Sequence, residues 1–250
     1  ETYNNKEFVK TSFIVAKNNS GVIYNCVVKG NITASSTKIA PVAIENHGFI
    51  NVVTNLAHII AKGANASDAG VSGFVCENSG VIYNSLAVGT IEVINMNSDY
   101  SVYTKITESN KISGFVLSNK DIITNCASGV TLPLMIKDAD ETDALNTTFK
   151  NSSSGTISNC FVDFYANGNY KEPSPSEGIV YTDNLNVEIV SKFSTNLWQE
   201  EVAGVIYGYR YPVLSIFKST SENGEQNEVL TKIENVLDTT ETKNNKVYHK

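Results

Sequence analysis

One short apolar phrase returns five times in the first two-thirds of the chain, and no other feature constrains the fold as strongly. The copies read GVIYNCVV from Gly21, GFINVVTN from Gly48, GVIYNSLA from Gly80, DIITNCAS from Asp121 and GTISNCFV from Gly155. Successive copies start about 27 to 41 residues apart. A period of a few tens of residues is the signature of a fold that stacks one repeated unit.

When the copies are aligned on the first residue of the phrase, like residues recur at several further positions. Counted from that residue, these positions are six before (Val15, Val42, Phe74, Phe115, Phe149), two before (Asn19, Asn46, Asn78, Asn119, Ser153), two after (Ile23, Ile50, Ile82, Ile123, Ile157), four after (Asn25, Val52, Asn84, Asn125, Asn159), five after (Cys26, Val53, Ser85, Cys126, Cys160) and eleven after (Ile32, Ile59, Ile91, Leu132, Ala166). Each shared position predicts a shared place in the stack.

The repeats are typical of β-strands, because they are short, rich in Val, Ile, Thr, Tyr and Phe, and bounded by Gly, Asn and Ser. We expect about three strands in each repeat: near the six-before position, through the Ile, and through the eleven-after position. Side chains alternate along a strand, so the Ile and Cys positions, three apart, cannot both face inward along a straight one. We therefore expect a bend at the intervening Asn, with stacked amides bonded along the repeats.

Stacking such repeats predicts an all-β fold, a right-handed parallel β-helix (β-solenoid) of about five to six laps. We expect the solenoid over residues 1–217 and a polar segment over 218–250, which holds a short amphipathic helix around 229–237 and links to a following module. A degenerate sixth repeat begins at Gly178 and closes with GYRYPVLSIF from Gly208. Trp198 is expected to cap the open stack there, since terminal repeats are atypical.

Cys26, Cys126 and Cys160 share one position with Val53 and Ser85, which suits a small side chain in a packed site. We expect these thiols to be buried and reduced. A disulfide is the alternative, and only Cys126 and Cys160 lie in neighbouring repeats, near enough to pair. No CxxC pair occurs, which argues against a zinc site.

The longer gaps between copies predict loops over residues 92–112 and 133–148. The second holds an acidic cluster, Asp138, Asp140, Glu141 and Asp143, for which calcium binding and a solvated loop are the two interpretations. The cluster lacks the Gly and terminal Glu of an EF-hand loop, so we predict no metal and no cofactor.

The charge pattern narrows the possible partners. The net charge is −7 and Arg210 is the only arginine, which argues against nucleic-acid binding. No apolar run approaches about 18 residues, so no membrane insertion is expected. Any secretion signal would lie upstream of Glu1.

The run from Gly73 to Ser85, GFVCENSGVIYNS, resembles the GLUG repeat, which reads roughly G, two hydrophobic residues, G-x-N-S-G-x-I-x-N and then Cys or Ser. In this run Cys76 stands where the repeat has its second Gly. The copy from Gly114 to Cys126 also matches, but Asp121 stands where the repeat has the Gly that follows N-S. The resemblance spans about residues 13–214. GLUG repeats occur in adhesin-like bacterial surface and secreted proteins and beside immunoglobulin-A-specific metallopeptidase domains, and they carry no catalytic residues.

No catalytic constellation is visible in the sequence. His47, His58 and His249 lack the HExxH spacing of a zinc peptidase, and His47 reads as a turn residue. A β-helix polysaccharide lyase or hydrolase would need clustered carboxylates with basic groups. Glu45 and Glu77 share the position three before the phrase with Asn18, Ser118 and Ser152, and we interpret both as exposed edge residues. We therefore predict no catalytic, cofactor-binding or metal site.

The resemblance implies a non-catalytic, extracellular or cell-surface repeat region of a large bacterial protein, acting as a stalk, a spacer or an adhesin-like surface. The alternative is an accessory domain of a secreted metallopeptidase. Expected partners are a host glycan or an extracellular protein, besides adjoining domains of the same polypeptide. Candidate contact groups are the long loops and Tyr24, Tyr83, Tyr100 and Tyr103.

Overall fold

The computed structural model describes the first five repeats, most of their strands and a few residues beyond them. The described residues are 10–34, 38–62, 70–96, 102–103, 111–132, 149–163, 178–183, 185, 193, 198–199 and 213–214. These residues are mostly strand, and the strands pair almost entirely in parallel. The all-β prediction is therefore confirmed for this part of the chain.

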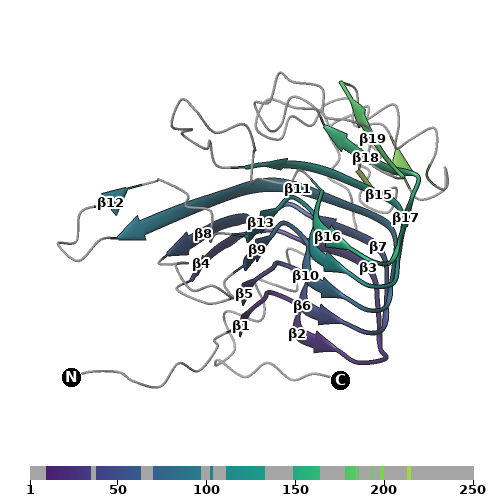
Figure 1. The fold of residues 1–250 in the computed structure, drawn as a ribbon, viewed down its shortest axis with the longest axis horizontal. Helices are drawn as coiled ribbons and strands as arrows, with labels where there is room; N and C mark the ends of the chain where they lie inside the picture. Colours follow the sequence, from purple (N-terminus) through teal and green to yellow (C-terminus); the bar gives the residue numbers. More distant parts are fainter. Residues whose placement is uncertain are drawn as a thin grey trace, which may run out of the picture.

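Each of the first four repeats contributes strands to three parallel sheets, and the fifth contributes described strands to two of them (Figure 1). In each sheet the repeats lie side by side in the order of the sequence. The smallest sheet has the order β1-β5-β9-β13, with β1 (Lys10–Thr11), β5 (Lys38–Ile39), β9 (Gly70–Ser72) and β13 (Lys111–Ser113). The sequence did not predict these short strands. Their segments share little sequence, so no aligned position marked them.

The second sheet has five strands in the order β16-β14-β10-β6-β2. They are β2 (Val15–Asn18), β6 (Ala43–Asn46), β10 (Val75–Asn78), β14 (Val116–Asn119) and β16 (Lys150–Ser153). Each begins at or next to the position predicted from the column of Val and Phe, so this strand of the repeat is confirmed.

The third sheet carries the repeated phrase and has β19-β18-β15-β11-β7-β3 as its main path. Its strands are β3 (Val22–Val28), β4 (Asn31–Ala34), β7 (Phe49–Asn55), β8 (His58–Lys62), β11 (Val81–Met96), β12 (Val102–Tyr103), β15 (Ile122–Thr131), β17 (Thr156–Ser158), β18 (Cys160–Asp163) and β19 (Ile179–Thr182). In the third repeat the two predicted strands, through the Ile and through the eleven-after position, run together as β11. In the fourth repeat β15 ends at Thr131, one residue before the eleven-after position Leu132. Ile32, Ile59 and Ile91 pair in register across β4, β8 and β11.

A sharp bend interrupts each of these strands four residues into the phrase, as predicted. Here the chain adopts a left-handed conformation, and the φ angles are 56° at Asn25, 57° at Val52, 46° at Asn84, 51° at Asn125 and 50° at Asn159. Asn enters this region more readily than most residues, because its short polar side chain can bond locally. The bend lets the Ile before it and the Cys after it both face inward.

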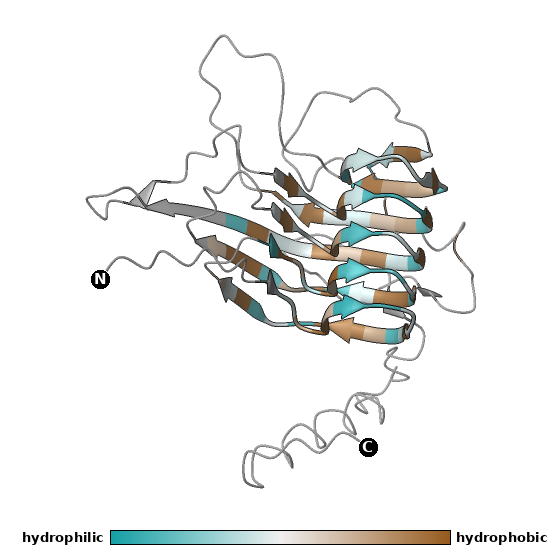
Figure 2. Ribbon diagram, turned by 60° about the horizontal axis from the view of Figure 1, so that its bottom comes forward, coloured by the Kyte–Doolittle hydropathy of each residue, from teal (hydrophilic) through white to brown (hydrophobic). Residues whose placement is uncertain are grey.

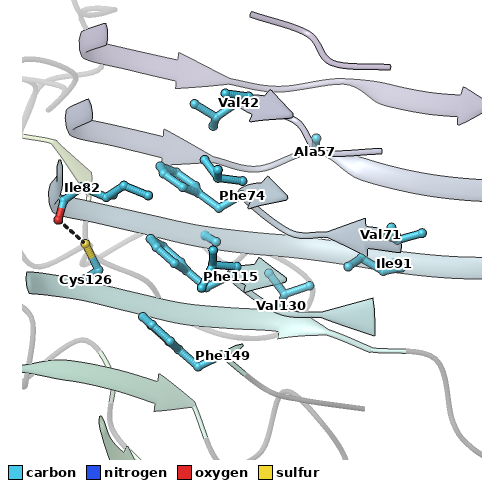
Figure 3. Packing of buried hydrophobic residues seen from close by; sticks show 14 of the residues in the cluster. Val42, Ala57, Val71, Phe74, Ile82, Ile91, Phe115, Cys126, Val130 and Phe149 are labelled. Atoms are coloured by element: carbon cyan, nitrogen blue, oxygen red, sulfur yellow. Dashed lines mark hydrogen bonds between the residues drawn. The ribbon is translucent and has the colours of Figure 1, made fainter. Parts of the chain in front are cut away.

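The core consists of columns of like side chains that stack from repeat to repeat. Ile50, Ile82 and Ile123 are fully buried, Ile157 is nearly so, and Ile23 at the open end is half-buried. Phe74, Phe115 and Phe149 stack with ring centroids 4.5 and 4.7 Å apart and interplanar angles of 10° and 8° (Figure 3). The strand spacing of about 4.8 Å sets this separation and holds the rings in a nearly parallel stack.

A ladder of buried amides runs beside the phenylalanines. Asn18 Nδ2 donates to Asn46 Oδ1 at 2.9 Å, Asn46 to Asn78 at 2.8 Å, Asn78 to Asn119 at 2.8 Å, and Asn119 to Ser153 Oγ at 3.2 Å. Every rung joins adjacent strands of the second sheet. Because a buried amide without partners is costly, the ladder favours this one register.

The first repeat shows that the predicted alignment was wrong by one residue before the phrase. Asn18, not Asn19, pairs with Asn46, and Val15 pairs with Ala43, so Ile14 is the counterpart of Val42. The turn between β2 and β3 holds one residue more than the turn after Asn46. The neighbouring asparagines made the two alignments indistinguishable in the sequence.

The sixth repeat begins near Gly178, as predicted, but in a different register. Ile179 pairs with Cys160, so Gly178 lies above the bend residue Asn159, and its φ is 74°. Glycine adopts this conformation without steric cost. Further along, Leu185 and Phe193 join Val52, Leu86, Val88, Ala127 and Phe161 in a second apolar cluster, separate from the main core.

Several sequence predictions fall on residues that the structure leaves undescribed. These are the helix around 229–237, the acidic loop 133–148, the domain boundary at 217 and Ala166, the eleven-after position of the fifth repeat. Trp198 lies in β20 (Trp198–Gln199), which pairs antiparallel with β21 (Val213–Leu214), but its side chain is not described.

The predicted boundaries of loop 92–112 were wrong. Strand β11 continues to Met96, where Glu92, Val93 and Ile94 still pair with β8. At the other end, Lys111 and Ile112 belong to β13. Apolar residues in the run IEVINM extend the strand past the point at which the repeat alignment stopped.

Candidate functional site

The second sheet carries a small charged cluster on its surface. Lys17 Nζ lies 3.3 Å from Glu45 Oε2, and His47 Nε2 lies 3.8 Å from the same oxygen. Lys38 from the smallest sheet pairs with Glu77. Glu45 and Glu77 are register partners on neighbouring strands, so this cluster holds two carboxylates and two ammonium groups.

These contacts correct the interpretation of Glu45 as an exposed edge residue, because its side chain is only 16% exposed. The side chain of Glu77 is 38% exposed, and each glutamate has its own lysine. Burial lowers the pKa of Lys38, but the hydrogen bond and negative charge of Glu77 outweigh it, so the pKa is raised overall. Each carboxylate is thus engaged by an ammonium group.

Sequence reasoning missed both lysines for identifiable reasons. The one-residue error in the first repeat put Asn18 where Lys17 belongs, and Lys38 lies in a strand that was not predicted. Partly exposed ion pairs of this kind contribute about 0–1 kcal/mol each to stability. We interpret the cluster as structural.

The phrase segments of the third sheet present a different surface, which we call the uncharged strip. Its two rows are the outward side chains one and three residues after the start of the phrase: Val22, Phe49, Val81, Ile122 and Thr156, and Tyr24, Asn51, Tyr83, Thr124 and Ser158. None of these ten side chains is charged, although 18% of the residues in the chain are Asp, Glu, Lys or Arg.

The strip is accessible along much of its length. Val22 is 67% exposed, Tyr24 51% and Ile122 41%, whereas the inward Ile82 between its two rows is fully buried. Phe49, Val81, Tyr83, Asn51, Thr124 and Ser158 are partly exposed. Figure 2 shows that the corresponding strands of successive repeats lie one above the other.

A second amide ladder follows the bend at the margin of the strip, as the sequence predicted. Asn159 Nδ2 donates to Asn125 Oδ1 at 2.5 Å, Asn125 to Asn84 at 3.3 Å, and Asn84 to Asn51 at 3.4 Å. In the second repeat Val52 occupies the bend and has no amide, so the neighbouring Asn51 accepts the hydrogen bond instead. The ladder is therefore continuous over four repeats.

At the first repeat the ladder stops. No side-chain hydrogen bond to the amide of Asn25 occurs among the described residues, and Asn51 uses only its oxygen in the ladder. At the opposite end of the strip, Ser158 Oγ donates to Thr124 Oγ1 at 2.8 Å. The end of the strip near Tyr24 thus has amide groups available for a ligand.

The cysteines do not form a reactive site. All four are free, and Cys76, Cys126 and Cys160 are buried, as expected, whereas Cys26 at the end of the stack is only half-buried. Desolvation raises the pKa of the Cys26 thiol. Desolvation and then the hydrogen bond and charge of Cys160 raise that of Cys126 well above its usual value. A thiol with a raised pKa is a poor nucleophile at neutral pH.

Neither a metal site nor a spanning helix emerges from the part of the chain that the structure describes. Within it, no three His, Cys, Asp or Glu side chains gather closely enough to hold a metal ion. No helix in the same residues has the length and hydropathy to cross a membrane. Tyr103 lies in β12, and Tyr100 and the acidic loop fall outside the described ranges.

Comparison of the chain with protein-family models, with curated proteins and with solved structures found no match.

Proposed function

We propose that residues 1–217 form a right-handed parallel β-solenoid of the GLUG-repeat kind. We propose further that it is a non-catalytic region of a large bacterial cell-surface or secreted protein, acting as a stalk, a spacer or an adhesin-like surface. The observation that carries this proposal is the common register of five repeats. The shared inward positions all serve packing and bending, and the outward positions vary freely.

The arrangement of charge supports a binding or spacing role over catalysis. The carboxylates that pair across the second sheet each face a lysine, and the uncharged strip lies on the third sheet. A repeat array that grows by adding units suits an extended scaffold, because each unit contacts only its neighbours. Outward residues on such a scaffold are free to contact a partner.

The proposal is tested on the isolated chain and on cells. The chain should release no fragments from casein, immunoglobulin A or a panel of polysaccharides, with or without zinc or calcium, as measured by mass spectrometry and by ultraviolet absorbance of unsaturated sugars. Antibodies against the chain should label intact cells that express the parent protein, and external protease should remove the label. Product release, or an epitope that only lysis exposes, would contradict the proposal.

A further inference from the structure

We propose that the uncharged strip binds a neutral polysaccharide that lies along the stacking direction of the repeats. This inference rests on the proposed function as a binding surface, and it assigns the ligand to the strip rather than to the long loops. Three properties of the strip support this assignment: its absence of charge, the spacing of its aromatic side chains and its amide groups that make no hydrogen bond among the described residues.

The absence of charge selects the chemical class of the ligand. Across the two rows, five repeats contribute aliphatic, aromatic, hydroxyl and amide groups and no Asp, Glu, Lys, Arg or His. A sulfated or uronate-rich glycan would lose its hydration here without gaining an ion pair.

The spacing of the tyrosines matches an extended sugar chain. Tyr24 pairs with Asn51, and Asn51 pairs with Tyr83, so the two tyrosines share one row with a single strand between them. Two strand spacings of about 4.8 Å place them roughly 10 Å apart. In an extended β-1,4-linked chain every second ring presents the same face at about this interval, so alternate rings can stack on Tyr24 and Tyr83.

The polar groups complete the surface. A sugar ring has an apolar face of C–H groups and a rim of hydroxyls. Tyr supplies a rigid amphipathic contact with few degrees of freedom to lose. Asn25 and Asn51 beside Tyr24, and Thr124 further along, supply both donors and acceptors for the hydroxyls. Since the strip is shallow, the affinity depends on several sugar units bound at once.

The first experiment identifies the class of ligand. The wild-type chain is applied to an array of neutral and anionic polysaccharides and to deglycosylated mucin, and then run in native gels that contain hydroxyethylcellulose, galactomannan, heparin or polygalacturonate. We expect retention by one or more neutral polymers, unchanged between low and high salt. Retention only by anionic polymers, retention by the deglycosylated protein or no retention at all would overturn the proposal.

The second experiment places the site. The double variant Tyr24→Ala/Tyr83→Ala should lose retention by at least about tenfold, as for aromatic anchors elsewhere. Tyr83→Phe should retain most binding, since the ring remains. The matched control is Phe13→Ala, which removes an exposed aromatic side chain outside the strip and should bind like the wild type. Equal retention by the double variant and the wild type would overturn the assignment to the strip.

The two proposals can fail separately. Both tyrosines are at least partly exposed, so circular dichroism and thermal unfolding should show the double variant folded. A chain that binds a polymer through the strip and also cleaves it would contradict the non-catalytic function alone. A chain that cleaves nothing and binds no neutral polymer would contradict the strip alone.

Discussion

At the residue scale, the bend position bears most directly on the fold. Its φ angles near 50° occur at four asparagines and at Val52, and a glycine takes the position in the sixth repeat. The sequence predicted a bend here from spacing alone, because two inward positions were an odd number apart. It did not predict that Val52, a β-branched residue, would adopt the same conformation. In the structure Val52 is buried in the second apolar cluster.

The bend predicts an unusual ranking of substitutions at Asn125. Both Asn125→Ala and Asn125→Gly lose the two ladder bonds, but only Ala places a Cβ in the left-handed region, which costs about 1–2 kcal/mol. Glycine loses more freedom on folding, which offsets part of that difference. We expect the Gly variant to be the more stable of the two, measured as the free energy of unfolding in urea.

The control for this ranking lies one residue earlier in the same strand. Thr124 has ordinary strand geometry, so Thr124→Gly should be less stable than Thr124→Ala. If Ala is better than Gly at both positions, the left-handed bend at Asn125 is wrong.

The buried thiol of Cys126 predicts a loss of stability at alkaline pH. Its pKa in the folded chain is raised well above the ordinary value of 9.0, so the unfolded chain loses the thiol proton first. Its contribution is therefore full below about pH 9 and declines as the pH rises through the folded pKa. We expect the free energy of unfolding in guanidinium to fall between pH 8 and pH 10.

The variant that isolates this effect is Cys126→Ser, because Ser85 already occupies the same position in the neighbouring repeat. The variant should fold and should show a smaller fall over the same pH range. An identical fall in both proteins would assign the alkaline sensitivity to other groups.

At the element scale, a strand or surface could be predicted from the sequence only where neighbouring strands share a residue type. The Ile, Phe and Asn columns were visible because parallel strands in register place like residues side by side. The uncharged strip was missed because its rows hold different residues, such as Tyr24, Asn51 and Thr124, and only the lack of charge unites them. The smallest sheet was missed because strands such as KT and KI are too short to carry a pattern.

The phenylalanine ladder predicts that position along the stack sets the cost of a substitution. Phe115 stacks on both Phe74 and Phe149, whereas Phe149 is described with one ring partner, Phe115. Phe115→Ala should cost about 3–5 kcal/mol, because it removes a fully buried ring and leaves a cavity between two others. Phe149→Ala should cost less. Urea unfolding of both variants measures the difference, and equal costs would argue against a continuous ladder.

At the scale of the whole molecule, equivalence between repeats is the property that matters most. In the three parallel sheets, the described strands of each repeat pair with those of the repeat before and the repeat after. The third and fourth repeats are in register from Ile82 and Ile123 through Thr90 and Thr131. If stability is a sum of repeats and interfaces, one whole repeat is removable without loss of the others.

Excision of residues 81–121 tests this equivalence. It joins Gly80 to Ile122, so β15 follows β10 and presents its side chains to β7 in the register that β11 now has. We expect a folded, strand-rich chain with a lower unfolding free energy and a cooperative thermal transition. The control removes residues 81–122 and shifts the new strand by one residue. Because side chains alternate, this shift turns Ile123 outward and Thr124 inward before the bend. The control should therefore be far less stable than the in-register excision, and two equally stable proteins would show that the inward and outward positions do not define the fold.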